Sequence, residues 1–359
     1  MQRFLLFTFS IFSLFFGNAQ INFDKTNSHQ IPLLQKMDSL ILSGKYERIT
    51  SVLVSHNGNV IFENYYNGKN VNSMHNTRSA TKTITGTLIG TLIDDKLLPS
   101  EDSNAITFFD KSAIQNYDKR KESITIEDLL TMSSILECND GNQFSRGNEE
   151  RMYLVESWDK FYWDLPIKGY PDWIKKPEDS KYGRSFSYCT SGTVVLGSII
   201  NQASKTSLAD YAYKRLFSQL GIEKRNYKWQ YTPTGIPMTG GGLQLRSRDL
   251  LKIAQLYLNK GNWNNRQLLS SEWVLKSMSP KVSINDNTEY GYLWWIKEFH
   301  KEKSYYMSGN GGNKAMVFPG LDLTVVVTTV NYNNRNAHNY TDEVLGKFIV
   351  PAVKKLKKQ

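Results

Sequence analysis

Apolar residues recur at helical spacing in the stretch from residue 79 to residue 95. Ile84 and Leu88 fall on one column of such a helix, and Leu92 follows one turn further along. Almost no charged side chain interrupts the apolar column. The pattern therefore predicts a central, buried helix over residues 79–95.

The rest of the chain divides into helical and strand-like patterns. Two strand-like runs surround Asn57-Gly58, a pair typical of the tight turn in a hairpin. Helices are expected at about residues 31–43, 126–132, 193–203, 208–220, 248–258 and 342–355, and strands at about 51–55, 59–65, 290–296, 315–318 and 323–330.

Strands near both ends with helices between them predict one sheet that both ends of the chain complete. The expected class is α/β (α+β), with an all-helical region inserted into the sheet domain. We expect the α/β domain to comprise residues 20–98 and 238–359, and the inserted helical domain residues 99–237.

The first 19 residues have the pattern of a secretory signal peptide. A basic start at Arg3 precedes a nearly all-apolar run over residues 4–16, and small residues up to Ala19 suit cleavage. The run is too short to span a bilayer comfortably, and no later segment is apolar enough to do so. We expect a periplasmic or extracellular protein without stable membrane insertion.

Composition narrows the function only by exclusion. With 40% hydrophobic and 22% charged residues, the chain is of ordinary globular type. The formal net charge is +10, but the basic residues are scattered, and the dense run at residues 354–358 is expected to be a solvated tail. No nucleic-acid-binding module is visible. The five histidines form no ligand-like pair, so no metal site is predicted.

Cys138 and Cys189 are the two cysteines of the chain. In an exported protein an even count permits a disulfide, and we hypothesise that the two pair. The alternative is two buried free thiols, which are common in protein cores.

Ser79 and Lys82 lie three residues apart at the start of the predicted buried helix, so they share one face. The amine can then contact the hydroxyl and help remove its proton, and a helix start favours the negative charge of acyl transfer. Ser157 and Lys160 have the same spacing, but among charges and aromatics typical of a surface-packed helix. Ser79 is therefore the candidate nucleophile; an ordinary helix start with a solvated lysine is the alternative.

The base must come from a side chain other than histidine, since neither a Ser-His-acid triad nor a Gly-x-Ser-x-Gly motif is found. Tyr188 lies in a short polar turn ahead of the predicted helix at 193–203. Such a turn can hold a functional group rigidly and still expose it. A packed core tyrosine is the alternative.

Several segments in this order resemble one family of serine hydrolases: class C β-lactamases, penicillin-binding DD-peptidases, and the related esterases and 6-aminohexanoate-dimer hydrolases. The resemblance covers nearly the whole mature chain and implies a β-lactamase/transpeptidase-like fold, in which helices flank an antiparallel sheet. The motifs are Ser79-Ala80-Thr81-Lys82, Tyr188-Cys189-Thr190 at the family's Tyr-x-Asn motif, and Met307-Ser308-Gly309 at its Lys-Thr-Gly or His-x-Gly motif.

The resemblance also implies the roles of the site residues. Ser79 is the expected nucleophile, and Lys82 and Tyr188 share its proton and return it to the leaving group. Backbone N–H groups of Ser79 and Asn310 are expected to form the oxyanion hole. This chemistry requires neither a metal nor an organic cofactor. The expected substrate-binding positions are Thr190, Met307, Ser308, Gly309 and Gly311.

Two departures from the family pattern bear on the substrate. Thr190 stands where an Asn is usual, and a hydroxyl offers fewer hydrogen bonds than an amide. Met307 stands where a Lys or His is usual, so attraction for the carboxylate of a β-lactam or a D-Ala-D-Ala terminus is weaker. Because the Ser, Lys and Tyr are intact, the favoured interpretation is an exported serine hydrolase that forms an acyl-enzyme with esters or small amides.

Two alternatives stay open. One is a D-amino-acid peptidase or β-lactamase that acts on cell-wall-type substrates. The other is a non-catalytic protein that uses the fold to bind peptide or peptidoglycan. In each case the partner is a small-molecule or peptide-like acyl compound rather than a nucleic acid.

Two further expectations follow from position in the chain. A Cys138–Cys189 bridge would tie the loop that carries Tyr188 to the loop that begins near Glu137. Trp294 and Trp295 either line the cleft or pack in the core beside the terminal sheet.

Overall fold

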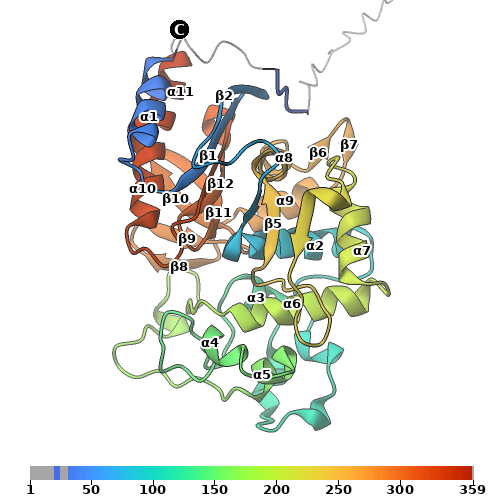
Figure 1. Ribbon diagram of the computed structural model, residues 1–359. Helices are drawn as coiled ribbons and strands as arrows, with labels where there is room; N and C mark the ends of the chain where they lie inside the picture. Colours follow the sequence, from blue (N-terminus) through green and yellow to red (C-terminus); the bar gives the residue numbers. More distant parts are fainter. Residues whose placement is uncertain (1–19, 25–30, 358–359) are drawn as a thin grey trace, which may run out of the picture.

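Figure 1 shows the computed structural model, which describes residues 20–24 and 31–357. The predicted signal peptide, residues 1–19, lies outside the described residues. An eight-stranded antiparallel sheet has the strand order β2-β1-β13-β12-β11-β10-β9-β8. Its strands are β1 (Ile49–His56), β2 (Asn59–Tyr65), β8 (Val282–Asn285), β9 (Thr288–Tyr290), β10 (Trp295–Phe299), β11 (Glu302–Gly309), β12 (Asn313–Phe318) and β13 (Leu323–Thr329). Because β1 pairs with β13, both ends of the chain complete one sheet, as predicted.

The hairpin predicted from Asn57-Gly58 is confirmed. β1 and β2 pair antiparallel, with His56 opposite Asn59. Asn57 and Gly58 have φ values of 51° and 72°, the left-handed backbone that a type I′ hairpin turn requires.

Helices cover both faces of the sheet (Figure 1). On the outer face lie α1 (Pro32–Leu42), α10 (Ala337–Glu343), a π-helical turn (Val344–Ile349) and α11 (Val350–Leu356). On the inner face lie α8 (Ser247–Leu258) and α2 (Thr81–Asp94). Strand β1 serves both cores, because Val52 and Val54 face the outer layer whereas Leu53 faces the inner one.

The other elements include a group of helices in the lower part of Figure 1, α3 to α6, and further short elements on its right-hand side. They are the helices α3 (Ile126–Leu130), α4 (Glu149–Met152), α5 (Trp158–Asp164), α6 (Thr190–Ala203), α7 (Leu208–Ala212) with a π-helical turn (Tyr213–Phe217), and α9 (Ser271–Ser277), and the strands β3 (Met74–Asn76), β4 (Tyr227–Trp229), β5 (Leu243–Arg246), β6 (Asn262–Trp263) and β7 (Arg266–Gln267). Residues 99–237 consist of helices joined by long loops, with one strand, β4, which pairs with β5 outside that range. The domain boundaries stay a prediction.

The predicted central helix is confirmed as α2, in which every residue from Thr81 to Leu92 is buried. Its threonines do not leave unpaired hydroxyls in the core. Thr83 donates to the carbonyl of Leu293 (2.6 Å), and Thr85 donates to the carbonyl of Thr239 (3.0 Å). These bonds tie α2 to both the sheet side and the loop ahead of β5.

One strand prediction for the C-terminal part is wrong. Residues 290–296 are not one strand, because Leu293 has a φ of 59° and its N–H donates to the carbonyl of Leu130 (2.8 Å), which turns the chain between β9 and β10.

The solvated tail predicted at residues 354–358 is found only in part. Lys355 and Lys357 are exposed, whereas Lys354 belongs to α11 and its amine lies 2.8 Å from the Glu302 carboxylate.

A buried polar seam runs between β1, β13 and β3. Thr50 bonds both the hydroxyl of Thr328 (2.8 Å) and the Nδ1 of His75 (3.2 Å). Burial, with a smaller contribution from the positive charge of Lys69, lowers the pKa of His75 to about 4. The imidazole of His75 is therefore neutral in the folded protein above that pH.

This seam predicts a loss of stability in mild acid. Below its ordinary pKa of 6.5 His75 binds a proton in the unfolded chain, whereas the folded chain resists protonation down to about pH 4. Its stabilising contribution is thus complete above pH 6.5 and is lost as the pH falls toward 4. We expect the free energy of unfolding to fall by about 2 kcal/mol between pH 7 and pH 5 through this group.

Chemical denaturation at pH 7, 6 and 5 measures this effect, with His75→Asn as the comparison. The variant is less stable at every pH but has a shallower pH dependence. His338, whose pKa burial also lowers to about 4, acts in the same direction in both proteins. Equal pH dependence in the two proteins would contradict the assignment to His75.

Candidate active site

Ser79 lies in a one-turn 3₁₀ helix (Arg78–Ala80) that leads directly into α2. Hydrogen bonds hold this turn from both sides. The Thr77 hydroxyl donates to the carbonyl of Leu243 (2.7 Å), and the Thr81 hydroxyl donates to the carbonyl of Arg78 (2.7 Å). Arg78 itself has a φ of 50°, a rare conformation for a residue with a side chain. The nucleophile candidate is therefore presented on a fixed turn.

Lys82 lies in the first turn of α2, three residues after Ser79, and points back at it. Its Nζ lies 3.1 Å from the Ser79 Oγ and 2.6 Å from the carbonyl oxygen of Gly240. The side chain is only 1% exposed. Such a buried, directed amine can exchange a proton with the serine hydroxyl.

Tyr188 completes the group of predicted catalytic residues. The Nζ of Lys82 lies 5.0 Å from the centre of the Tyr188 ring. Trp295 packs on the same ring, with 5.8 Å between ring centres. Among the described residues none is hydrogen-bonded to the Tyr188 hydroxyl. The structure thus brings Ser79, Lys82 and Tyr188 together around one amine.

Gly309 lets the end of β11 approach the nucleophile turn. A Cβ atom at this position would lie 2.1 Å from the carbonyl oxygen of Thr77, so a larger residue would force the strand away. The next residue, Asn310, is exposed, and its amide exchanges hydrogen bonds with the Asn333 side chain and backbone N–H (2.9 Å each). The oxyanion hole formed by Ser79 and Asn310 stays a prediction. It is compatible with the position of the end of β11, which lies against the turn that contains Ser79.

The predicted substrate-binding positions divide into two groups. Ser308 is partly exposed, and Gly311 lies in the turn after β11 with a φ of 89°. Met307 and Thr190, in contrast, are both 0% exposed. Met307 packs in the inner core, and Thr190 turns its hydroxyl to Asp140. The predicted substrate contacts of Met307 and Thr190 stay a prediction. Their complete burial argues against such contacts.

Asp140 is a site residue that the motifs did not indicate. One of its carboxylate oxygens accepts from the N–H and the hydroxyl of Thr190 (2.8 and 2.7 Å), and the other accepts from the N–H of Glu149 (3.0 Å). Burial raises the pKa of Asp140, although the positive charge of Lys82 and the bonds from Thr190 oppose the shift. Asp140 therefore lies in the same electrostatic environment as the Lys82 amine.

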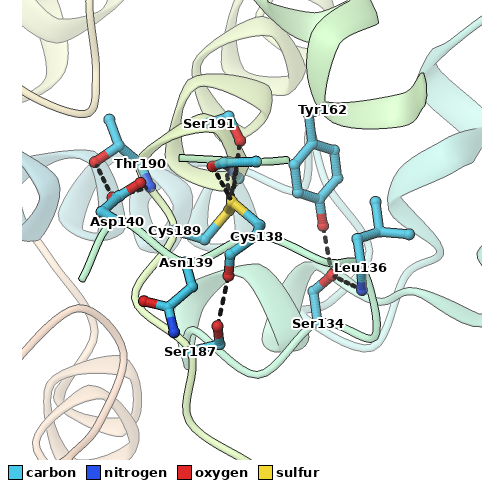
Figure 2. Close-up of a disulfide and its surroundings, with 12 residues drawn as sticks. Ser134, Leu136, Cys138, Asn139, Asp140, Tyr162, Ser187, Cys189, Thr190 and Ser191 are labelled. Atoms are coloured by element: carbon cyan, nitrogen blue, oxygen red, sulfur yellow. Dashed lines mark hydrogen bonds between the residues drawn. A yellow bond between two sulfur atoms is a disulfide. The ribbon is translucent and has the colours of Figure 1, made fainter. Parts of the chain in front are cut away.

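Cys138 and Cys189 form a disulfide, as hypothesised (Figure 2). The bridge is one of several ties between their two segments. The N–H of Asp140 donates to the carbonyl of Tyr188 (2.8 Å), and the Ser187 hydroxyl donates to the carbonyl of Cys138. The loop with Tyr188 is therefore fixed to the loop with Asp140, as the positions of the two cysteines predicted.

The second Ser-x-x-Lys match has a structural role. The Ser157 hydroxyl caps α5 by accepting from the N–H of Lys160 (3.3 Å), and the Lys160 amine pairs with Asp164. This is the ordinary surface-packed helix that its composition indicated.

The two neighbouring tryptophans play different parts. Trp294 is 0% exposed and packs on Tyr257, with 4.6 Å between ring centres. Trp295 is partly exposed and contacts Tyr188. Core packing is thus the correct interpretation for the first, and a position beside the site for the second.

In the described part of the chain, no cluster of three or more His, Cys, Asp or Glu side chains is arranged to hold a metal ion. None of the described helices has the length and apolarity to cross a bilayer.

The chain belongs to the Beta-lactamase family, whose model matches residues 49–345, and this membership places it among the serine hydrolases. The family resemblance of the motifs and the predicted fold are thereby confirmed. No curated protein sequence matches the chain.

Solved structures show the same fold. A candidate 6-aminohexanoate-dimer hydrolase from Bacillus anthracis is 21% identical, with a TM-score of 0.70 over 95% of this chain and 89% of that one. A D-stereospecific amidohydrolase from Streptomyces sp. is 14% identical, with a TM-score of 0.65 over 86% and 97% of the two chains. EstCE1, described as a hydrolase with promiscuous acyltransferase activity, is 12% identical, with a TM-score of 0.68 over 88% and 97%.

The disulfide predicts a coupled loss of stability and activity. We expect Cys138→Ser/Cys189→Ser to lower the free energy of unfolding by about 4 kcal/mol, since the bridge closes a loop of 51 residues. Ser at position 189 can still cap α6, because the Cys189 sulfur accepts from the N–H of Gly192. Hydrolytic activity should fall as well, because the loop with Tyr188 loses its covalent tie.

Denaturant titration and initial rates on one ester, with and without dithiothreitol, measure both effects. Reductant should affect the wild type and leave the double variant unchanged. Unaltered melting and unaltered rates in the reduced wild type would contradict a role for the bridge.

Proposed function

We propose that this protein is an exported serine hydrolase that cleaves esters or small amides through an acyl-enzyme. The observation that carries the proposal is the position of the Lys82 amine, 3.1 Å from the Ser79 hydroxyl and 5.0 Å from the Tyr188 ring centre. A serine with two potential proton carriers in reach is what acyl transfer requires when no histidine is present.

The proposed reaction has two halves. Ser79 attacks the carbonyl carbon of the substrate while its proton passes to the Lys82–Tyr188 pair, and the pair returns that proton to the leaving alcohol or amine. The N–H groups of Ser79 and Asn310 stabilise the oxyanion that forms in each half. Water then attacks the acyl-enzyme by the reverse path and releases the acid.

The choice of esters and small amides rests on the two departures from the family motifs. The Thr190 hydroxyl is bonded to Asp140, and Met307 is buried, so neither position offers the amide or the cation with which β-lactam substrates are held. Folds of this type occur in a protein named an amidohydrolase and in one described as a hydrolase with acyltransferase activity, which agrees with acyl chemistry beyond β-lactams.

Export is part of the proposal. The pattern of the first 19 residues and the disulfide support it, since disulfides persist mainly in oxidising compartments. The substrate would then be met in the periplasm or outside the cell.

A substrate panel with matched variants tests the function. We expect p-nitrophenyl acetate to be hydrolysed faster than nitrocefin or a D-Ala-D-Ala peptide. Ser79→Ala should lower the rate by about a thousandfold or more, and Tyr188→Phe by about a hundredfold or more, because each removes a group of the acyl-transfer step.

Ser157→Ala is the control, because Ser157 has the same spacing to a lysine but only caps α5. It should cost about 1 kcal/mol of stability and keep the ester rate. Faster turnover of nitrocefin or the peptide would instead indicate the cell-wall alternative. No turnover, together with no fluorophosphonate labelling of Ser79, would indicate the non-catalytic binding protein.

A further inference from the structure

Arg78 is an exposed cation directly beside the nucleophile. It precedes Ser79 in the chain, and its N–H donates to the Asn76 side chain (3.0 Å). This bond and those of the Thr77 and Thr81 hydroxyls fix the turn. The backbone of Arg78, from which its side chain extends, therefore has a fixed position relative to Ser79.

The guanidinium of Arg78 is also held at its far end. It lies over the ring of Tyr332, 4.2 Å from the ring centre. That ring in turn packs beneath the turn after β11, since a Cβ atom at Gly311 would lie 3.1 Å from it. Stacking and a side-chain hydrogen bond between Arg78 and Tyr332 hold the planar guanidinium at this ring, and its remaining N–H groups can donate to a ligand.

The charged groups around Ser79 differ in how many hydrogen bonds or ion pairs they already form with other protein groups. Asp140 accepts three hydrogen bonds, and Glu149 accepts one from the Tyr153 hydroxyl. The Lys82 amine is buried against Ser79 and Gly240. Within the described part of the chain, no carboxylate oxygen lies within 4.0 Å of the Arg78 guanidinium.

We propose that Arg78 binds a carboxylate of the substrate, so that the preferred substrates are esters or amides that carry a carboxylate on the acyl part. The inference rests on the proposed acyl transfer at Ser79 and adds the substrate class. A stacked guanidinium that has no carboxylate partner among the described residues can take one in two parallel hydrogen bonds through its remaining N–H groups. Met307 on β11 stands where a Lys or His is usual and offers no cation. Arg78 would supply a cation from the side of Ser79 where Tyr332 lies.

Two esters of equal acyl length test the proposal. Mono-p-nitrophenyl glutarate carries the carboxylate, and p-nitrophenyl pentanoate has none. We expect wild type to prefer the glutarate ester in kcat/KM, and Arg78→Gln to lower this preference by about tenfold or more. The loss should appear mainly in the KM for glutarate, because Arg78 binds the substrate and does not carry its proton.

Two kinds of control accompany Arg78→Gln. Arg225→Gln makes the same change in net charge at a side chain that is 79% exposed and paired with Glu223, and it should keep the preference. Tyr332→Phe retains the ring and should keep the preference, whereas Tyr332→Leu removes the stacking platform and should weaken it.

Equal kcat/KM for the two esters in wild type, or an unchanged preference in Arg78→Gln, would overturn the proposal. If wild type hydrolyses neither ester, the proposed ester cleavage is wrong. The role of Arg78 is then tested separately, by the binding of boronic acids to Ser79. In that case 3-carboxyphenylboronic acid should bind wild type more tightly than phenylboronic acid, by a margin that Arg78→Gln loses. An equal margin in both proteins would refute the carboxylate site.

Discussion

The buried amine of Lys82 is the interaction on which the site depends. A cation withdrawn from water is strongly unfavourable unless fixed partners replace its hydration. Here the partners are the Gly240 carbonyl and the Ser79 hydroxyl, with the Asp140 charge nearby. They come from the loop ahead of β5, the start of α2, and the disulfide-linked loop. Correct assembly of these three segments therefore provides the polar partners of the lysine and builds the geometry of the candidate site.

Two of the motif positions do not face solvent. Thr190 bonds Asp140, which lies beside the loop with Tyr188, and Met307 is part of the core. Arg78, which precedes Ser79 in the chain, is exposed. The proposed substrate contact of Arg78 therefore lies at a position that none of the three motifs contains.

The sequence predicted those parts whose signals are local. The apolar column of α2, the Asn57-Gly58 turn and the Ser157 helix start all depend on residues a few positions apart. Asp140 could not be predicted in this way, because it meets Thr190 from 50 positions away, between two loops that the disulfide also joins. The strand expected through Leu293 failed for a related reason, since a distant carbonyl at Leu130 fixes that turn.

The pairing of β1 with β13 has a consequence for the order of folding. The disulfide and most of the helices lie between these strands in the chain, so they can form while the last residues are still being made or translocated. Gly309 and Asn310 reach the nucleophile only when β11 joins a sheet that needs both ends of the chain. Contacts so distant in sequence form slowly. The strand end at Gly309 and Asn310 therefore reaches Ser79 through contacts that join the two ends of the sequence.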